Sequence, residues 1–122
     1  MNAAMRNSRE AVEERRRRWG AALESEVQRM VRILSRRPEV REVILFGSLG
    51  RGTARFHSDI DLLIVADTDL RLADRIEQML RLLRPRISAD VIVYTPREWA
   101  SDPGTELFRR RVRAEGRVLY AA

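Results

Sequence analysis

Hydrophobic residues in the first third of the chain follow a helical spacing. Between residues 8 and 37 the apolar positions recur three, four or seven residues apart, on one helical face: Val12, Trp19, Leu23, Val27, Met30 and Leu34. Gly20 is a weak helix former, and we expect it to weaken the middle of this helix. Pro38 follows the segment, so we expect the helix to end there.

Three later apolar runs have the length of strands, at residues 40–46, 60–65 and 87–94. The second run is apolar on both faces, which is typical of a central strand covered on each side. Residues 70–84 carry apolar side chains on one helical face and stop at Pro85, which predicts a crossover helix. Asp67 and Asp69 precede this helix and are suited to cap it.

The C-terminal quarter contains a helix start with a strong local signature. Thr95-Pro96-Arg97-Glu98 combines a capping box with proline at the first helical position. Residues 101–104 break this short helix, residues 105–115 restart it, and Gly116 is suited to end it. Residues 118–120 predict a short edge strand. The elements together predict an α/β fold in which helices flank a small sheet in two or three layers.

Length and composition limit the number of domains and exclude several kinds of functional site. The 122 residues suffice for one domain, 1–122, in which 1–37 is an arginine-rich N-terminal helix. The absence of cysteine excludes disulfide frameworks and thiolate metal sites, and a single histidine, His57, excludes paired-histidine metal sites. Every one of the 24 basic residues is arginine, which excludes the lysine of a Walker A loop and Schiff-base chemistry. No apolar run is long enough for a membrane span, and we expect a cytoplasmic protein without membrane contact.

The formal charge of +6 permits an anionic partner such as nucleic acid. Much of this charge lies in residues 15–18, which are all arginine. Glu13 and Glu14 precede Arg17 and Arg18 by four residues, the favourable order for ion pairs along a helix. A solvated helix face is therefore favoured over a nucleic-acid patch.

Three aspartates interrupt the apolar strands. Asp59 and Asp61 stand at the start of the run 60–65, and a spacing of two in a strand points both side chains to one face. Asp90 lies near the start of the run 87–94. Because a crossover makes these strands parallel, their starts lie together and Asp90 comes beside the other two. Carboxylates without histidine or cysteine favour Mg²⁺ or Mn²⁺, and three of them suit two ions that bridge a phosphoryl group.

A glycine-rich segment follows the first strand, Gly47-Ser48-Leu49-Gly50-Arg51-Gly52. Its glycines let backbone N–H groups approach a phosphate, Ser48 adds a hydroxyl and Arg51 adds a fixed positive charge. For this segment to reach the aspartates, the first strand must run antiparallel to the second, so we expect a mixed sheet. An aspartate pair alone can also cap a loop, but the combination with this segment and Asp90 indicates a metal and nucleotide site.

Residues 47–52, followed by Ser58-Asp59-Ile60-Asp61-Leu62, resemble the GSxxRG…SDxDL pattern of the minimal nucleotidyltransferase family. This family is a branch of the superfamily that contains DNA polymerase β. Asp90 matches the third carboxylate of the family, and residues 115–120 resemble its closing segment. The resemblance covers about residues 40–120 and implies a nucleotidyltransferase fold, while the arginine-rich N-terminal helix is less characteristic.

The resemblance also implies roles for the site residues. Asp59 and Asp61 would bind two Mg²⁺ ions, with Mn²⁺ as a substitute, while Asp90 would bind one ion and help to deprotonate the acceptor. Gly47 and Ser48 would hold the β- and γ-phosphates of the nucleotide triphosphate, with Arg51 as an electrostatic helper. The implied reaction transfers AMP from ATP to a hydroxyl group and releases pyrophosphate. Family members of this size are commonly antitoxins that adenylylate a tyrosine of a HEPN-domain toxin.

Two alternatives stay open on the sequence. A non-catalytic antitoxin would mask a toxin by contact, through the helix that carries Trp19 and the C-terminal segment; three clustered carboxylates count against it. An enzyme acting on RNA, such as a tRNA end, would be favoured by the arginines. The edge strand and the aromatic helix also admit a homodimer.

Overall fold

A four-stranded mixed sheet forms the centre of the computed structural model, which describes residues 3–50 and 59–122. The strand order is β3-β2-β1-β4, and the strands span Val40–Phe46 (β1), Ile60–Ala66 (β2), Ala89–Tyr94 (β3) and Arg117–Ala121 (β4). β1 pairs antiparallel with both β2 and β4, whereas β2 and β3 are parallel. The mixed sheet, its antiparallel first strand and its C-terminal edge strand are therefore confirmed.

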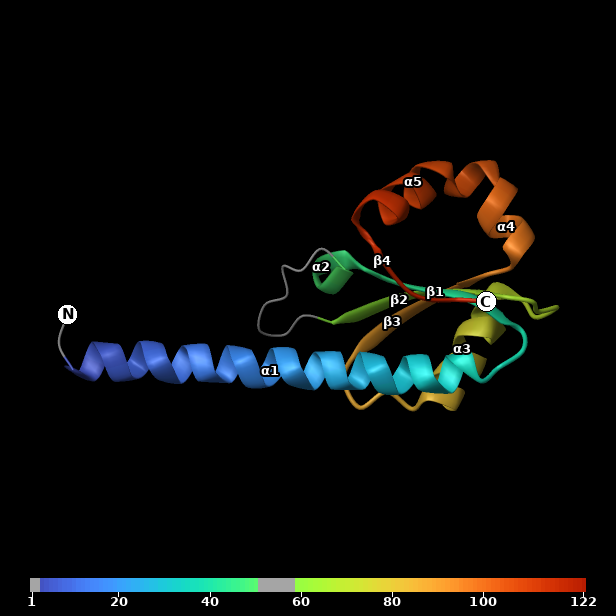
Figure 1. The fold of residues 1–122 in the computed structure, drawn as a ribbon. Helices are drawn as coiled ribbons and strands as arrows, with labels where there is room; N and C mark the ends of the chain where they lie inside the picture. The colour runs from blue at the N-terminus through green and yellow to red at the C-terminus, as the bar shows by residue number, and fades with distance from the viewer. Residues whose placement is uncertain (1–2, 51–58) are drawn as a thin grey trace.

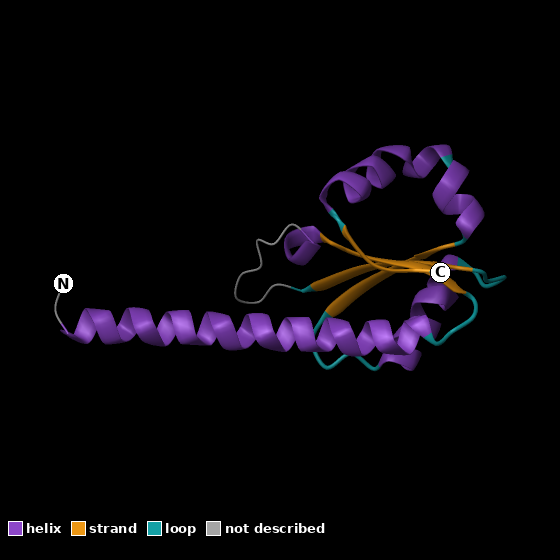
Figure 2. Ribbon diagram, viewed as in Figure 1, coloured by secondary structure: helices purple, strands orange, loops and turns teal. Residues whose placement is uncertain are grey.

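Helices cover both faces of this sheet, so the fold has three layers (Figures 1 and 2). The long helix α1 (Ala3–Ser35) and the crossover helix α3 (Leu72–Leu83) lie on one face. The other face carries α4 (Pro96–Ser101), the 3-10 turn η1 (Pro103–Thr105) and α5 (Glu106–Glu115). A single turn, α2 (Gly47–Gly50), follows β1 directly.

Two apolar clusters hold the three layers together. Leu62 and Ile64 of β2 face α1 and α3, where they join Leu23, Val27, Met30, Leu34, Met79 and Leu83. Leu63 and Val65 face the opposite way and pack with Ile44, Trp99 and Val112. Because neighbouring side chains in a strand point to opposite faces, a strand buried on both sides must be apolar throughout. This explains why residues 62–66 of β2, which follow Asp61, are all hydrophobic.

Helix α1 extends well beyond the sheet at its N-terminal end (Figure 1). Residues 7–22 are exposed apart from the half-buried Glu14 and Trp19. Val12, expected on the apolar face of this helix, is 41% exposed and lies outside the core. The helix also passes through Gly20 without a break, and a Cβ atom added there would lie in open space.

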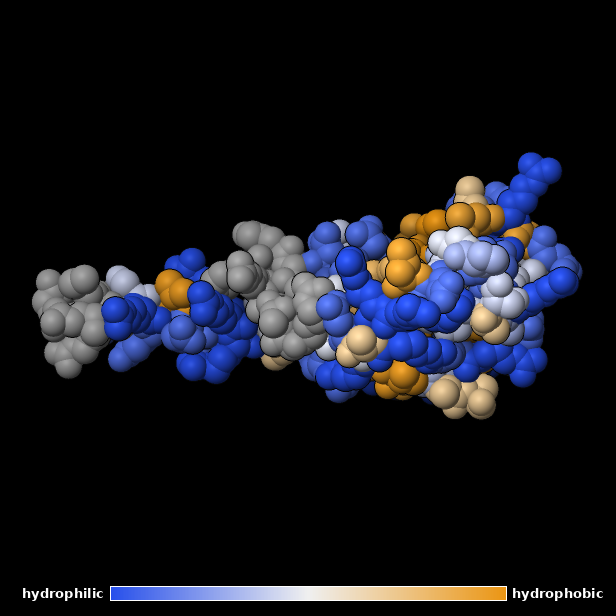
Figure 3. All heavy atoms as spheres, turned by 90° about the horizontal axis from the view of Figure 1, so that it is seen from above, coloured by the Kyte–Doolittle hydropathy of each residue, from blue (hydrophilic) through white to orange (hydrophobic). Residues whose placement is uncertain are grey.

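The extended part of α1 has a hydrophilic surface (Figure 3). Glu14 accepts hydrogen bonds from Arg17 at 2.6 Å and from Arg18 at 3.2 Å, and Glu13 lies 3.8 Å from Arg16. Of the two predicted pairs, Glu14 with Arg18 is confirmed, whereas Arg17 pairs with Glu14 instead of with Glu13. No helix in the described part of the chain is long and apolar enough to cross a membrane.

One helix and one strand, α3 and β3, begin at other residues than predicted. Asp67 does not cap α3, because its carboxylate accepts two hydrogen bonds from Arg41, at 2.7 and 2.8 Å. The helix begins at Leu72 rather than at residue 70, and its N-cap is Arg71, whose side chain makes no capping hydrogen bond. Strand β3 begins at Ala89 rather than at residue 87, and the backbone N–H of Arg86, just before it, donates to Glu26 of α1.

Glu26 is the buried charge that ties α1 to this turn. The residue is only 5% exposed. Its carboxylate accepts two hydrogen bonds from Arg29 and one from the backbone N–H of Arg86. The bond from Arg29 is the largest cause that lowers the pKa of Glu26 to about 2. The ionised carboxylate therefore stabilises the folded protein at neutral pH.

We expect Glu26→Gln to lower the free energy of unfolding at pH 7 by roughly 2 kcal/mol, since charge-assisted hydrogen bonds are lost. The folded-state pKa of Glu26 is depressed, so its contribution is fully present above pH 4.5 and is lost as the pH falls toward 2. The difference between the two proteins should therefore shrink over that interval. Urea unfolding between pH 7 and pH 3 measures this, and a difference independent of pH would contradict it.

Candidate functional site at the start of strands β2 and β3

Asp61 and Asp90 occupy paired positions on the parallel strands β2 and β3. Paired residues of neighbouring strands lie about 4.8 Å apart and point to the same face. Asp61 has the same parity as Leu63 and Val65, so this face is the one covered by α4 and α5. Phe46, the last residue of β1, pairs with Asp61 from the other side. The predicted meeting of Asp61 and Asp90 at the strand starts is confirmed.

Asp59 directly precedes β2, and its side chain is exposed. Among the described residues, no three acidic, histidine or cysteine side chains gather closely enough to form a metal centre. The donors nevertheless have the chemistry that Mg²⁺ prefers, because the paired positions Asp61 and Asp90 supply only carboxylate oxygens. The residues present therefore fit a hard divalent cation, and a role for Asp59 in holding it stays a prediction.

Gly47 connects β1 to the carboxylates. Its φ of 66° lies in the left-handed region, which side chains disfavour. A Cβ atom built on Gly47 would overlap the Oδ2 atom of Asp61. Glycine is therefore required here for two reasons, the backbone conformation and the close approach of the Asp61 carboxylate.

We expect Gly47→Ala to displace the Asp61 carboxylate and to reduce any activity of this site at least about 100-fold, because misplaced catalytic groups are costly. The free energy of unfolding should fall by only about 1–2 kcal/mol, the cost of the left-handed conformation, since the short Asp61 side chain can rotate away. Gly20→Ala is the matched control: it lies inside α1 with nothing within 4 Å of its new Cβ, and should stabilise the protein slightly. Thermal melting and activity assays of both variants test this, and an active Gly47→Ala protein would contradict it.

A small cavity adjoins Gly47 on the β1 side of the carboxylates. Its volume is about 180 Å³, and it is lined by Phe46, Gly47, Phe108, Arg111, Val112 and Glu115. Phe46 and Phe108 meet edge to face, with ring centroids 5.7 Å apart. Phe108 and Arg111 could not be assigned to the site from the sequence, since their place around this cavity depends on α5 folding back over β1.

Two predicted nucleotide-binding residues are not tested by this geometry. Arg51 lies outside the described residues. Ser48 is placed in α2, where only its backbone is described. Their predicted contacts with a triphosphate therefore stay predictions.

Tyr94 lies at the opposite end of β3 from Asp90, in the cluster under α4. Its ring stacks on Trp99 with centroids 5.6 Å apart. Burial, and secondarily the charges of Asp102 and Glu98, raise the pKa of its phenol above the usual value. The phenol therefore stays protonated at neutral pH, and its ring belongs to the packing under α4.

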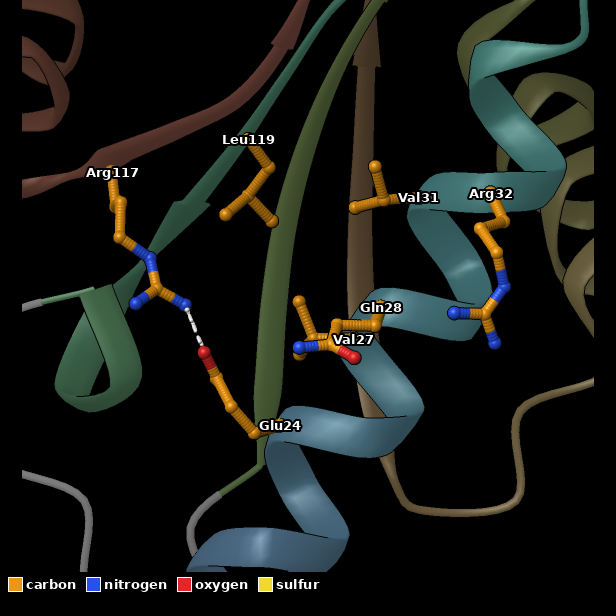
Figure 4. A pocket seen from close by; sticks show the side chains of 7 residues that line it. All are labelled: Glu24, Val27, Gln28, Val31, Arg32, Arg117 and Leu119. Atoms are coloured by element: carbon orange, nitrogen blue, oxygen red, sulfur yellow. Dashed lines mark hydrogen bonds and ion pairs between the residues drawn. The ribbon is translucent and has the colours of Figure 1, made fainter.

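A second and larger cavity, of about 400 Å³, lies between α1 and β4. Figure 4 shows Val27, Val31 and Leu119 around it, with Arg117 reaching across to Glu24. The two side chains form a hydrogen bond of 2.8 Å, which ties the edge strand to the helix. The cavity is lined by apolar groups and by Glu24, Gln28, Arg32 and Arg117, and contains none of the predicted site residues.

Comparison with known proteins agrees with this arrangement. A protein of Methanocaldococcus jannaschii named "Putative protein adenylyltransferase" is 38% identical over 84 residues, which cover 69% of this chain and 82% of that protein. A nucleotidyltransferase-like crystal structure from Sulfolobus solfataricus superposes with a TM-score of 0.61 at 25% identity, covering 84% of this chain and 83% of the other. A toxin–antitoxin structure with AMP-PNP has the same fold, with a TM-score of 0.51, 20% identity and coverage of 81% and 73%.

The family model described as "Polymerase beta, Nucleotidyltransferase" matches residues 28–122. This match includes the whole sheet, the Gly47 turn and all three aspartates, and leaves out only the first part of α1. With its three-layered fold around a mixed sheet and two paired carboxylates beside a glycine turn, the chain belongs to the polymerase beta family of nucleotidyltransferases.

Proposed function

We propose that this protein transfers AMP from ATP to a hydroxyl group of a partner protein. The observation that carries the proposal is the pairing of Asp61 with Asp90 directly beside the left-handed Gly47. This places two hard oxygen donors next to a turn at which only glycine fits, which suits a metal-bound triphosphate. The relative from Methanocaldococcus jannaschii, whose name describes a protein adenylyltransferase, supports this acceptor class.

Each residue of the site then has a distinct role. Asp59, Asp61 and Asp90 would hold Mg²⁺, which when bound offsets the negative charge of the phosphates. Gly47 and Ser48 would bind the β- and γ-phosphates, and Arg51 would add a positive charge beside them. Asp90 lies on the edge strand β3 and is exposed, so an acceptor can reach it.

The reaction exchanges one bond for another at the α-phosphorus. The acceptor hydroxyl oxygen forms a bond to the α-phosphorus while the bond to the bridging oxygen of the β-phosphate breaks. Asp90 accepts the hydroxyl proton, and pyrophosphate leaves with the electron pair of the broken bond. The carboxylate of Asp90 is suited to this role because its side chain is exposed and directly neighbours Asp61.

The partner that this proposal names is a HEPN-domain toxin, with this chain as its antitoxin. The fold shared with a toxin–antitoxin structure containing AMP-PNP supports the choice of partner and of ATP. The ion pairs that Arg16, Arg17 and Arg18 form along α1 weigh against an RNA acceptor, because part of that charge is already balanced within the helix.

The test is incubation of this protein with the product of its neighbouring gene, ATP and Mg²⁺, followed by mass spectrometry. We expect AMP on a tyrosine of the partner and no modification when Asp61→Asn replaces the wild-type protein. A partner that stays unmodified but is fully neutralised by Asp61→Asn would favour a contact-only antitoxin. Transfer to tRNA, lost together with binding when Arg15 to Arg18 are neutralised, would overturn the protein acceptor.

A further inference from the structure

Helix α5 carries four arginines, and three of them are engaged with the rest of the domain. Arg109 donates to the backbone oxygen of Trp99 at 2.8 Å. Arg110 pairs with Glu106 at 2.9 Å, and Arg113 pairs with Glu42 at 2.5 Å.

Arg111 is different from its three neighbours. It is exposed, and it makes no hydrogen bond or ion pair with any residue in the described part of the chain. A guanidinium group is charged at every physiological pH and offers several donors in one plane. Arg111 therefore presents a positive charge that has no hydrogen-bonded or ion-paired partner among the described residues, on the face of the sheet that carries the carboxylates.

The position of Arg111 relative to Asp61 and Asp90 follows from the cavity lining and from the pairing of β1, β2 and β3. Arg111 and Gly47 line the same cavity, and Gly47 closely approaches the Asp61 carboxylate. Phe46, another wall of the cavity, pairs with Asp61 across β1 and β2. Asp90 pairs with Asp61 from the other side, on β3. The cavity and Asp90 therefore flank Asp61 from opposite directions.

We infer that Arg111 binds the pyrophosphate end of the nucleotide, the part that leaves in the proposed reaction. The inference rests on the proposed function, in which Asp90 marks the side of the acceptor. In phosphoryl chemistry the attacking and leaving oxygens lie roughly in line, so the leaving group belongs on the side opposite Asp90. The Gly47 cavity lies on that side. The guanidinium of Arg111, which lines this cavity, can form two parallel hydrogen bonds to phosphate oxygens.

Arg111 transfers no proton, since its guanidinium stays protonated throughout. Its charge offsets the negative charge that the bridging oxygen and the β-phosphate gain when the bond to the α-phosphorus breaks. Glu115 also lines the cavity, one helical turn after Arg111, and has an interaction of its own. It adds a negative charge at the cavity wall, which makes the positive charge of Arg111 more necessary for binding an anion.

The test compares Arg111→Ala, Arg111→Lys and the control Arg110→Ala in the adenylyl transfer assay, with pyrophosphate and AMP as inhibitors. For Arg111→Ala we expect the KM for ATP and the inhibition constant of pyrophosphate to rise about 10- to 100-fold, the range for charge-assisted hydrogen bonds. Inhibition by AMP, which lacks the leaving phosphates, should change less than about twofold, and Arg111→Lys should be intermediate. Arg110→Ala removes a neighbouring arginine that pairs with Glu106 and should leave all three constants unchanged.

Two results would overturn the assignment while leaving the proposed function intact. Pyrophosphate inhibition could stay unchanged in Arg111→Ala, or AMP inhibition could weaken by the same factor, which would place the contact elsewhere on the nucleotide. A wild-type protein that binds neither ATP nor pyrophosphate would overturn the proposed function and the role of Arg111 with it.

Discussion

Replacing Asp61 by Asn is expected to reduce nucleotidyl transfer at least about 1,000-fold while the protein stays folded. Asn has nearly the shape of Asp but no negative charge, so it can no longer balance a divalent cation beside Asp90. Asp61 is also the carboxylate that Gly47 approaches and that lies between Phe46 and Asp90 in the sheet. No other described side chain holds this central position.

Asp67→Asn is the matched control for this substitution. Asp67 directly follows β2 at its far end and pairs with Arg41 on the surface, at 2.7 Å. The Asp67→Asn protein should retain full activity, because Asp67 lies at the other end of β2 from Asp61. It should also stay folded, since an exposed ion pair contributes little to stability. Steady-state transfer rates and circular dichroism of both variants provide the comparison. Comparable rates for Asp61→Asn and the wild-type protein would show that Asp61 has no role in the reaction.

Replacing Asp90 by Asn should move stability and activity in opposite directions. Like charges directly opposite each other in a sheet are destabilising, and Asp90 faces Asp61 in the register of β2 and β3. Without metal, the variant should gain up to about 1 kcal/mol in free energy of unfolding at neutral pH. Its transfer activity should nevertheless collapse, because Asp90 accepts the proton of the acceptor in the proposed reaction.

Melting of both proteins, with and without Mg²⁺ and ATP, measures this effect. A ligand that binds only the folded state raises its stability, so Mg²⁺ with ATP should stabilise the wild-type protein more than Asp90→Asn. If Asp90→Asn melts below the wild-type protein without metal and keeps full activity, Asp90 is a structural hydrogen-bonding residue instead.

Much of the fold was predictable because its signals are local. β1 coincides with the predicted residues 40–46, since an apolar run of strand length is bounded by Pro38 and Gly47. The capping box is also confirmed: Thr95 accepts from the backbone of Glu98 at 3.2 Å, and Glu98 accepts from the backbone of Thr95 at 2.8 Å. The meeting of Asp61 and Asp90 followed from one topological rule, the parallel crossover.

The features that were missed depend on contacts between distant parts of the chain. Asp67 is a good capping residue by type, but Arg41, 26 residues earlier, holds its carboxylate. The turn before β3 is held by Glu26, which accepts from the backbone of Arg86, 60 residues away. In the sequence Arg111 cannot be distinguished from the other arginines of α5. Only the folded structure shows that the others are paired and that Arg111 is not, among the described residues. Periodicity reports which face of an element is buried but not which polar partner it meets.

Transfer of a nucleotide is distinguished from transfer of a phosphate by the position of a radioactive label in ATP. The protein, its partner and Mg²⁺ are incubated with ATP labelled at the α-phosphate and, separately, at the γ-phosphate. We expect label on the partner only from the α-phosphate, with the γ-label recovered in pyrophosphate and both signals lost in Asp61→Asn. Label on the partner from the γ-phosphate, or transfer that survives in Asp61→Asn, would contradict it.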